Sequence, residues 1–317
     1  MNRSVVFMFS GQGSQYYGMG RELYMSNPVF RTWMTRLDDI HTDITGRSVL
    51  KTLYDDTHRR AEEFDTLLDT HPAIFMVEYA LTQVLLEKGI YPDYVLGSSL
   101  GEYASVAVAD CMSYEDTLQC IIKQARLVEA YCPEGGMMAI IGDPGLYDKA
   151  SILNTNSELA SINFDSHFVI SGSCEGLTEI EHYLKANGLI YQRLPVHYAF
   201  HASLMDPIAL EYMAFLKLKT IRSPRINVVS SMYGEKATGL DSHFLWDITR
   251  KPIQFQSALK CLGDRDGVVY IDLGPSGTLA NFVKYNFGPQ KKASVCSVLS
   301  PFQQDIKNLD RLFEMFD

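Results

Sequence analysis

The sequence predicts an α/β fold in which a small module is inserted into a larger domain. Short apolar segments of strand length alternate with longer helical patterns along most of the 317 residues, as in an α/β domain. Near residues 134–197 the expected order becomes β-α-β-β-α-β, which is the ferredoxin-like order. A chain of this length suits one large domain with an inserted module, or two domains, and can bury a sizeable core.

The first part of the chain contributes a strand and a long helix. Residues 5–9 are apolar and read as a buried strand, because they are too few for the hydrophobic segment of a secretory signal. A helix is expected over residues 72–88. Thr70 can cap this helix, Pro72 suits its first turn and Gly89 ends it.

The inserted module and the last third of the chain are read from shorter segments. In the module, strands are expected at residues 136–141, 159–164, 168–171 and 189–196, and helices at 145–153 and 177–186. Further core strands are expected at 226–231, 268–273 and 294–298.

Composition excludes several classes of protein. Lys and Arg number 28 against 38 Asp and Glu, a net charge of −10, whereas a dedicated nucleic-acid binder normally carries a basic patch. No apolar run approaches the roughly 20 residues of a transmembrane helix. The six cysteines show no CxxC spacing, so we expect buried thiols in a cytoplasmic protein rather than disulfides or metal ligands.

The strongest local signal is the sequence G-S-S-L-G at residues 97–101. It lies between an expected strand at 92–97 and an Ala- and Val-rich helix at 100–110, which is the context of a G-x-S-x-G nucleophile elbow. Ser99 would stand on a sharp turn at the helix N-terminus, where the helix dipole and backbone N–H groups favour negative charge. A plain tight turn is the alternative, and the strand-turn-helix context favours the catalytic interpretation.

Two further segments could serve the same chemistry. Residues 10–15, S-G-Q-G-S-Q, follow the first strand and can present backbone N–H groups to an anion, although the third glycine of a dinucleotide fingerprint is missing. A simple strand-to-helix loop is the alternative. His201 could be the base that takes the Ser99 proton, but its position favours it only slightly over His197 or His71.

These segments together resemble the malonyl-CoA:acyl-carrier-protein transacylase family, which includes polyketide synthase acyltransferases. The resemblance covers essentially the whole chain. Its landmarks are residues 9–15, 97–102, 133–137, 198–201 and 273–275. Members have an α/β-hydrolase-like large domain with a ferredoxin-like insertion. The resemblance therefore implies a large domain of residues 1–133 and 198–317 and a small domain of residues 134–197.

The resemblance also implies ping-pong chemistry with a Ser-His dyad. Ser99 would attack an acyl thioester, and His201 would act as general base and then general acid. Backbone N–H groups of Gln12 and Leu100 would hold the oxyanion. A backbone carbonyl would orient the histidine, and Gln254 is the matching position. The enzyme would be a monomer. It would need no metal and no organic cofactor of its own, because the phosphopantetheine arm belongs to its partner, an acyl carrier protein.

One departure from the family concerns the charge of the substrate. Malonyl transferases carry an arginine that binds the free carboxylate of malonate, and counting back from residues 133–137 places Gln124 at that position. Arg126 lies two residues further on, about 200° around a helix, and should point away. We therefore expect acetyl, propionyl or longer monocarboxylic acyl groups to be preferred over malonyl. A one-turn shift that lets Arg126 bind the carboxylate is the alternative.

Other departures concern the rest of the expected substrate pocket. Ser98 replaces the histidine of the family's Gly-His-Ser elbow, and His71 replaces the glutamine of its Thr-Gln-Pro-Ala segment. A histidine that has moved to fill the same space is one explanation, and a reshaped pocket is the other. Tyr198 and Phe200 mix elements of the malonyl- and methylmalonyl-type segments and do not decide between those substrates.

The missing arginine and the free-standing length look like one branch of this family. In polyketide pathways with separately encoded, trans-acting acyltransferases, that branch consists of acyl hydrolases that remove stalled acyl groups from carrier proteins, a proofreading role. Water and a carrier thiol can both resolve one acyl-enzyme, so a transferase that loads carriers is the first alternative. A non-catalytic homologue that binds a carrier protein is the second, and the intact Ser99, His201 and Gln12 argue against it.

Overall fold

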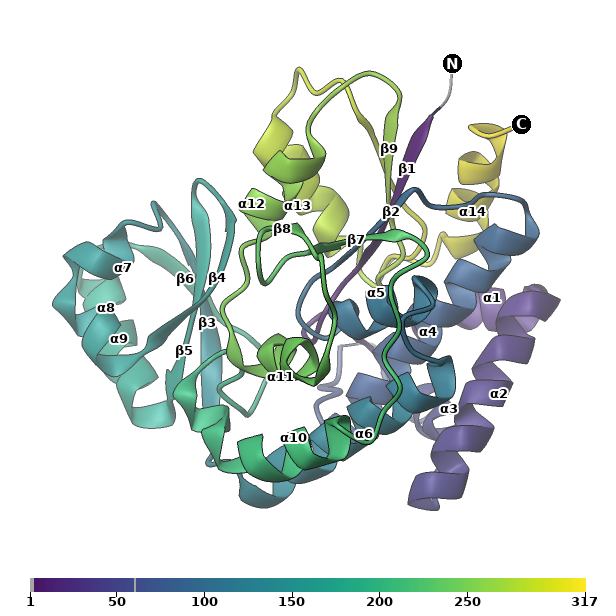
Figure 1. Ribbon diagram of the computed structural model, residues 1–317. Coiled ribbons are helices and arrows are strands. Elements are labelled where there is room, and N and C mark those ends of the chain that lie inside the picture. The colour runs from purple at the N-terminus through teal and green to yellow at the C-terminus, as the bar shows by residue number, and fades with distance from the viewer. Residues whose placement is uncertain (1–2, 60) are drawn as a thin grey trace.

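The computed structural model describes residues 3–59 and 61–317 and contains a large and a small sheet, each covered by helices (Figure 1). The large sheet has the strand order β10-β9-β1-β2-β7-β8, and all neighbouring strands are parallel except β7 and β8. Its strands are β1 (Ser4–Phe9), β2 (Tyr94–Gly97), β7 (Asn227–Ser230), β8 (Glu235–Lys236), β9 (Val268–Asp272) and β10 (Ser294–Ser297). A mostly parallel sheet between helices confirms the predicted α/β class.

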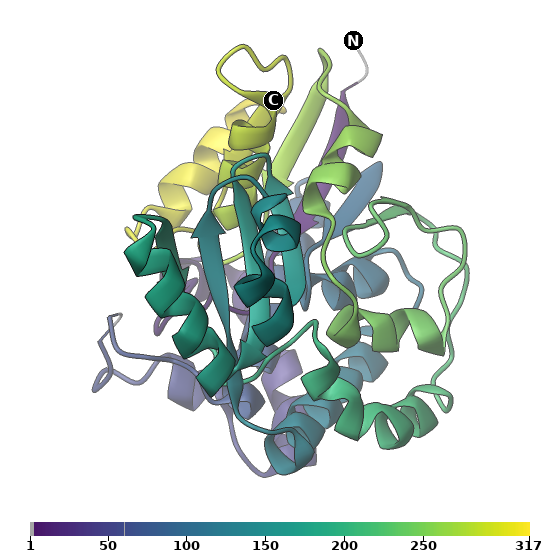
Figure 2. The same ribbon diagram turned by 90° about the vertical axis from the view of Figure 1, so that its left-hand side faces the viewer.

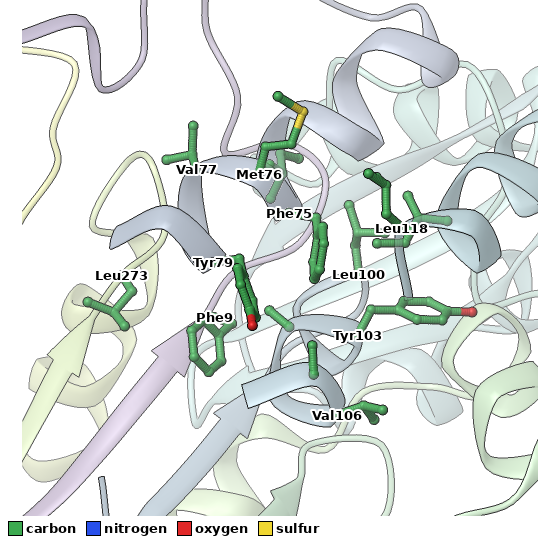
Figure 3. Packing of buried hydrophobic residues seen from close by; sticks show 14 of the residues in the cluster. Phe9, Phe75, Met76, Val77, Tyr79, Leu100, Tyr103, Val106, Leu118 and Leu273 are labelled. Atoms are coloured by element: carbon green, nitrogen blue, oxygen red, sulfur yellow. The ribbon is translucent and has the colours of Figure 1, made fainter. Parts of the chain in front are cut away.

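Two layers of helices enclose this sheet. Side chains alternate along β1, so Phe7 and Phe9 pack into one layer while Val6 and Met8 pack into the other. The first layer contains α4 (Leu67–Glu87), α5 (Gly101–Val108) and α6 (Tyr114–Tyr131), and the second contains α12 (Phe255–Leu262) and α13 (Thr278–Phe287). Figure 3 shows residues of the first layer packed together, with Tyr79 and Phe75 of α4 lying near Phe9 of β1 and Tyr103 of α5.

Helix α4 begins at Leu67, five residues before the predicted start, so Pro72 lies inside the helix rather than in its first turn. Proline has no N–H group, and the carbonyl of Leu68, four residues earlier, therefore loses its helical partner. The ring Nε2 of His41 lies 3.1 Å from this carbonyl oxygen and replaces the lost partner in the tautomer that carries its proton on Nε2. A contact from a distant helix thus makes the interior proline tolerable.

The small sheet has the order β4-β5-β3-β6 with every pair antiparallel, as the ferredoxin-like pattern predicts. Helices cover one face, against Met138, Ile140, Phe168 and Ile170, and the opposite face turns toward the large domain. Figure 2 has this domain toward the viewer. Its elements are β3 (Gly135–Ile141), α7 (Leu146–Lys149), α8 (Ser151–Asn156), β4 (Glu158–Phe164), β5 (His167–Ser173), α9 (Cys174–Ala186) and β6 (Ile190–Arg193).

The remaining helices complete the large domain. They are α1 (Arg21–Ser26), α2 (Pro28–Thr45), α3 (Val49–Leu53), η1 (Ser203–Ile208), α10 (Ala209–Leu216), α11 (Ser242–Arg250) and α14 (Asp305–Glu314). Within the described part of the chain, no helix is both long and apolar enough to span a bilayer. All six cysteines are free thiols, but the expectation that they are buried holds only for Cys111 and Cys120. Cys132 and Cys296 are half-buried, and Cys174 and Cys261 are exposed.

Candidate active site

Ser99 stands on a tight turn between β2 and α5. Its φ angle is 55°, a left-handed conformation that is rare for a residue with a side chain and that marks strain at functional sites. The turn needs glycine two residues later, since a Cβ atom on Gly101 would lie 2.1 Å from the carbonyl oxygen of Phe9. The backbone therefore has the form of a nucleophile elbow.

His201 lies directly opposite this serine. Its Nε2 atom is 2.8 Å from Ser99 Oγ, and its φ angle of 63° is also left-handed. The last turn of α11 holds the histidine in place, because His201 N–H donates to the Thr249 carbonyl at 2.9 Å and Nδ1 lies 2.8 Å from the Lys251 carbonyl. A carbonyl can only accept, so Nδ1 carries the proton and Nε2 is left to accept from the serine hydroxyl.

The carbonyl that orients the histidine belongs to Lys251, which corrects the prediction of Gln254. Lys251 ends α11 in an extended conformation, so its carbonyl leaves the helix and faces His201. Ile253 then pairs with β4 through two backbone hydrogen bonds of 2.8 and 2.9 Å. This bridge carries the chain away from the site, and Gln254 N–H donates instead to the Ser231 carbonyl.

Burial sets the protonation state of His201. The ring is almost completely inaccessible to solvent, and burial lowers its pKa to about 4, although the Lys251 carbonyl opposes this shift. The histidine is therefore neutral at pH 7 and can accept the Ser99 proton. Seven other histidines occur in the chain, and in the described residues only His201 hydrogen-bonds to Ser99.

Because the pKa of His201 is lowered, we expect Ser99 to keep its reactivity at a lower pH than a serine paired with an ordinary histidine would. We expect the rate at which a fluorophosphonate probe labels Ser99 to stay within about twofold between pH 7 and about pH 5.5, where an ordinary histidine would leave about a tenth of the rate. Only the neutral ring accepts the proton, so reactivity should fall as pH drops toward about 4. A midpoint between about pH 6 and 7 in protein that circular dichroism shows to be folded would contradict the assignment.

The loop after β1 lies against the elbow. A Cβ atom on Gly11 would meet Ser99 Cβ at 2.7 Å, so glycine permits this close approach. Gln12 of this loop and Leu100 of the elbow both line the same cavity as Ser99 and His201. The two predicted oxyanion-binding residues are thus brought together beside the serine.

The cavity beside Ser99 has a volume of about 460 Å³ and lies between the two domains. Among the described residues, no lysine or arginine lines it. Three histidines do, and burial lowers the pKa of each one, to about 3 for His71, to about 4 for His201 and in the same direction for His167. At neutral pH the described walls therefore carry no positive charge.

Gln124 occupies the position predicted for the missing arginine. It is 2% exposed, and its Nε2 atom donates to Thr249 Oγ1 and, at 3.5 Å, to Tyr103 Oη. His71 is also buried on the cavity wall, close enough to the Gln124 side chain for this amide to oppose the fall in its pKa, and its ring packs 5.4 Å from that of Phe200. This part of the cavity is closed, neutral and partly aromatic.

Arg126 is exposed on the opposite side of α6. Its guanidinium donates to the Ile44 carbonyl at 2.8 Å and does not line the cavity. This position contradicts the alternative in which a one-turn shift lets Arg126 bind a substrate carboxylate. The helical spacing predicted the outcome.

The structure separates the remaining predicted residues. Ser98 and Phe200 line the cavity, whereas Tyr198 lies outside it, so Tyr198 is withdrawn as a pocket residue. His197, considered as an alternative base, forms a 2.7 Å pair with Asp65 at the surface.

Several residues at or behind the cavity wall could not be predicted from the sequence. Thr249 lines the cavity and Tyr103 lies behind Gln124; both accept from the Gln124 amide, and no local pattern points to them. The small domain contributes the polar residues Ser161, Asn163 and His167 through the face of its sheet that lacks helices. Two irregularities in the pairing of β4 with β5 interrupt the alternation along β4, so the sequence pattern could not have indicated which of its residues face the large domain.

Comparison with known proteins gives the family. The acyl transferase domain family matches residues 6–316. The chain is 47% identical over 312 residues to "Polyketide biosynthesis acyltransferase homolog BaeD" of Bacillus velezensis, covering 98% of this chain and 96% of the relative. It is 47% identical over 310 residues to the homolog PksD of Bacillus subtilis, with the same coverage.

Solved structures agree with this result. The acyltransferase domain from the second module of the salinomycin polyketide synthase has a TM-score of 0.87 at 28% identity and covers 100% of this chain and 74% of that one. The malonyl CoA-acyl carrier protein transacylase of Clostridium perfringens has a TM-score of 0.81 at 25% identity, covering 99% and 98%. The chain belongs to the acyl transferase domain family.

Proposed function

We propose that this protein is an acyl hydrolase of polyketide biosynthesis that releases monocarboxylic acyl groups from acyl carrier proteins. The observation that carries the proposal is the neutral cavity next to Ser99, with Gln124 where a carboxylate-binding arginine would stand. A malonyl group would bury its free carboxylate there without a positive partner, at a cost of several kcal/mol. An acetyl or butyryl chain has no free carboxylate and therefore does not incur this cost.

The proposed chemistry needs only the groups already described. His201 Nε2 takes the Ser99 proton as Oγ attacks the thioester carbonyl carbon, and the backbone N–H groups of Gln12 and Leu100 stabilise the oxyanion. The carbon–sulfur bond then breaks and His201 returns the proton to the leaving thiolate. In the second half, a water molecule gives a proton to His201 and attacks the acyl-enzyme. The ester bond breaks, Ser99 recovers its proton and the free acid leaves.

The similar proteins support a polyketide pathway and a carrier-bound substrate. BaeD and PksD are polyketide biosynthesis acyltransferase homologs of nearly the same length as this chain. "Polyketide biosynthesis protein ThaF" of Burkholderia thailandensis is 38% identical over 308 residues, although this chain spans only 26% of that protein. The resemblance to free-standing proofreading hydrolases supports hydrolysis as the fate of the acyl-enzyme.

Transfer of the acyl group to a second carrier is the competing function, since the similar solved structures are acyltransferase domains. The two functions share one acyl-enzyme and differ only in the acceptor, so they must be separated by product.

We therefore expect a two-carrier assay to show hydrolysis. Unlabelled carrier protein bearing an acetyl or butyryl group on its phosphopantetheine arm is mixed with ¹⁵N-labelled, unacylated carrier and the enzyme, and intact mass spectrometry follows both carriers. The proposal predicts loss of the acyl mass from the donor, no gain on the labelled carrier and no change of a malonyl donor. Acyl mass on the labelled carrier would establish transfer instead, and Ser99→Ala controls for spontaneous thioester loss.

A further inference from the structure

The loop that carries Gln12 contacts one buried carboxyl group, that of Glu78. Glu78 of α4 is 1% exposed, and its Oε1 atom lies 2.6 Å from Ser10 N and 3.1 Å from Ser10 Oγ. We propose that Glu78 and Ser10 form a positioning pair that sets the direction of the Gln12 N–H group and thereby the rate of attack by Ser99. This inference rests on the proposed function of Ser99 and adds a residue that touches no substrate.

The contacts continue from Glu78 to the Gln12 N–H group. Ser10 Oγ donates to Ser14 Oγ at 3.0 Å, and Ser14 Oγ donates to the Gly11 carbonyl at 2.7 Å. The Gly11 carbonyl and the Gln12 N–H belong to one planar trans peptide, so they point in opposite directions. A hydrogen bond that fixes this carbonyl therefore also fixes the N–H that would face the oxyanion.

The two carboxyl oxygens of Glu78 differ in their contacts. Oε2 is buried and makes no hydrogen bond to any residue that the structure describes, so the carboxyl group meets the loop through Oε1. Burial, together with nearby Asp272, raises the pKa of Glu78 well above its usual range and so favours the neutral form of the group. A neutral acid supports the loop without a negative charge that would oppose the oxyanion. Glutamine is accordingly its closest substitute.

The chain offers a matched control in Asp38 of α2. This carboxyl group is also buried, and it likewise contacts one serine hydroxyl, Ser48 Oγ at 2.6 Å, and one backbone N–H group, Leu50 N at 3.1 Å. Its partners belong to the start of α3 and do not line the cavity. Asp38→Leu thus removes the same kind of bonds from the fold without touching the oxyanion loop.

The test compares Glu78→Leu, Glu78→Gln, Ser10→Ala and Asp38→Leu with the wild-type protein. The readouts are the second-order rate at which a fluorophosphonate labels Ser99, and kcat and KM for acetyl-carrier. A whole oxyanion donor is worth about 10²–10³-fold in kcat, so displacing one should lower labelling and kcat about 10–100-fold in Glu78→Leu, with KM within about threefold. The labelling rate and kcat of Glu78→Gln should remain within about threefold of the wild-type values, and those of Ser10→Ala should fall about 3–10-fold. Asp38→Leu should lower Tm but leave the labelling rate and kcat within about twofold of wild type.

Two results would overturn the inference: folded Glu78→Leu that labels at the wild-type rate, or Glu78→Gln that is as slow as Glu78→Leu. If Glu78→Leu does not fold, Ser10→Ala decides, and a wild-type labelling rate in that variant overturns the inference. Failure of the proposed function is a separate outcome, because wild-type Ser99 would then react with the probe while acetyl-carrier stays intact.

Discussion

Ser99→Ala is expected to lower the rate of acyl release from acetyl-carrier by at least about 10³-fold, because the acyl-enzyme cannot form without the hydroxyl group. Removal of the base should be nearly as severe, so His201→Ala is expected to fall within about tenfold of Ser99→Ala. The two residues act as one unit through their 2.8 Å contact, and the double variant should be no slower than the worse single variant. Initial rates and intact mass of the enzyme measure both effects.

The neighbouring serine supplies the control for this prediction. Ser98 lines the same cavity and is one residue away, but His201 contacts Ser99. Ser98→Ala should therefore still gain the mass of an acetyl group when it is mixed with acetyl-carrier. An acyl adduct that persists in Ser99→Ala and disappears in Ser98→Ala would move the nucleophile and overturn the assignment.

Gln124→Arg is expected to raise kcat/KM for malonyl-carrier relative to acetyl-carrier by about 10–100-fold. A charge-assisted hydrogen bond contributes about 1.5–3 kcal/mol, and a buried guanidinium without a carboxylate partner is destabilising. The variant should thus gain malonyl turnover and lose acetyl turnover, because the arginine also replaces the amide that donates to Thr249. The ratio of the two specificity constants is the measurement.

Two further variants test whether the charge at position 124 causes the expected gain in malonyl turnover. Gln124→Met keeps the cavity neutral and should leave malonyl turnover at its low level. Arg126→Gln removes the cation considered as the alternative, which is exposed and bonded to the Ile44 carbonyl. This variant should change the turnover of neither substrate by more than about twofold. A loss of malonyl turnover in Arg126→Gln would restore the alternative in which Arg126 binds the carboxylate.

The parts of the site that the sequence predicted correctly are those that depend on local geometry. A strand, two glycines and a helix within one short segment are enough to indicate the turn at Ser99. Likewise, the helical repeat separates Gln124 from Arg126 by about 200°, so their opposite orientations follow from spacing alone.

The predictions that failed depend on tertiary contacts. Pro72 was expected in the first turn of its helix, where proline is common, but His41 satisfies the carbonyl that an interior proline releases. The carbonyl that orients His201 was placed three residues too late. Its position depends on where α11 ends and on the pairing of Ile253 with the small domain, and neither is visible in residues 251–254 alone.

The most direct test of the account is a competition for Ser99. The protein is mixed with equal concentrations of acetyl-carrier and malonyl-carrier, quenched in acid after a short interval, and its intact mass is recorded. The neutral cavity predicts an acetyl adduct on Ser99 in excess of any malonyl adduct by at least about tenfold, together with free acetate. A predominant malonyl adduct would contradict the claim that the absence of a positive charge at Gln124 selects the substrate.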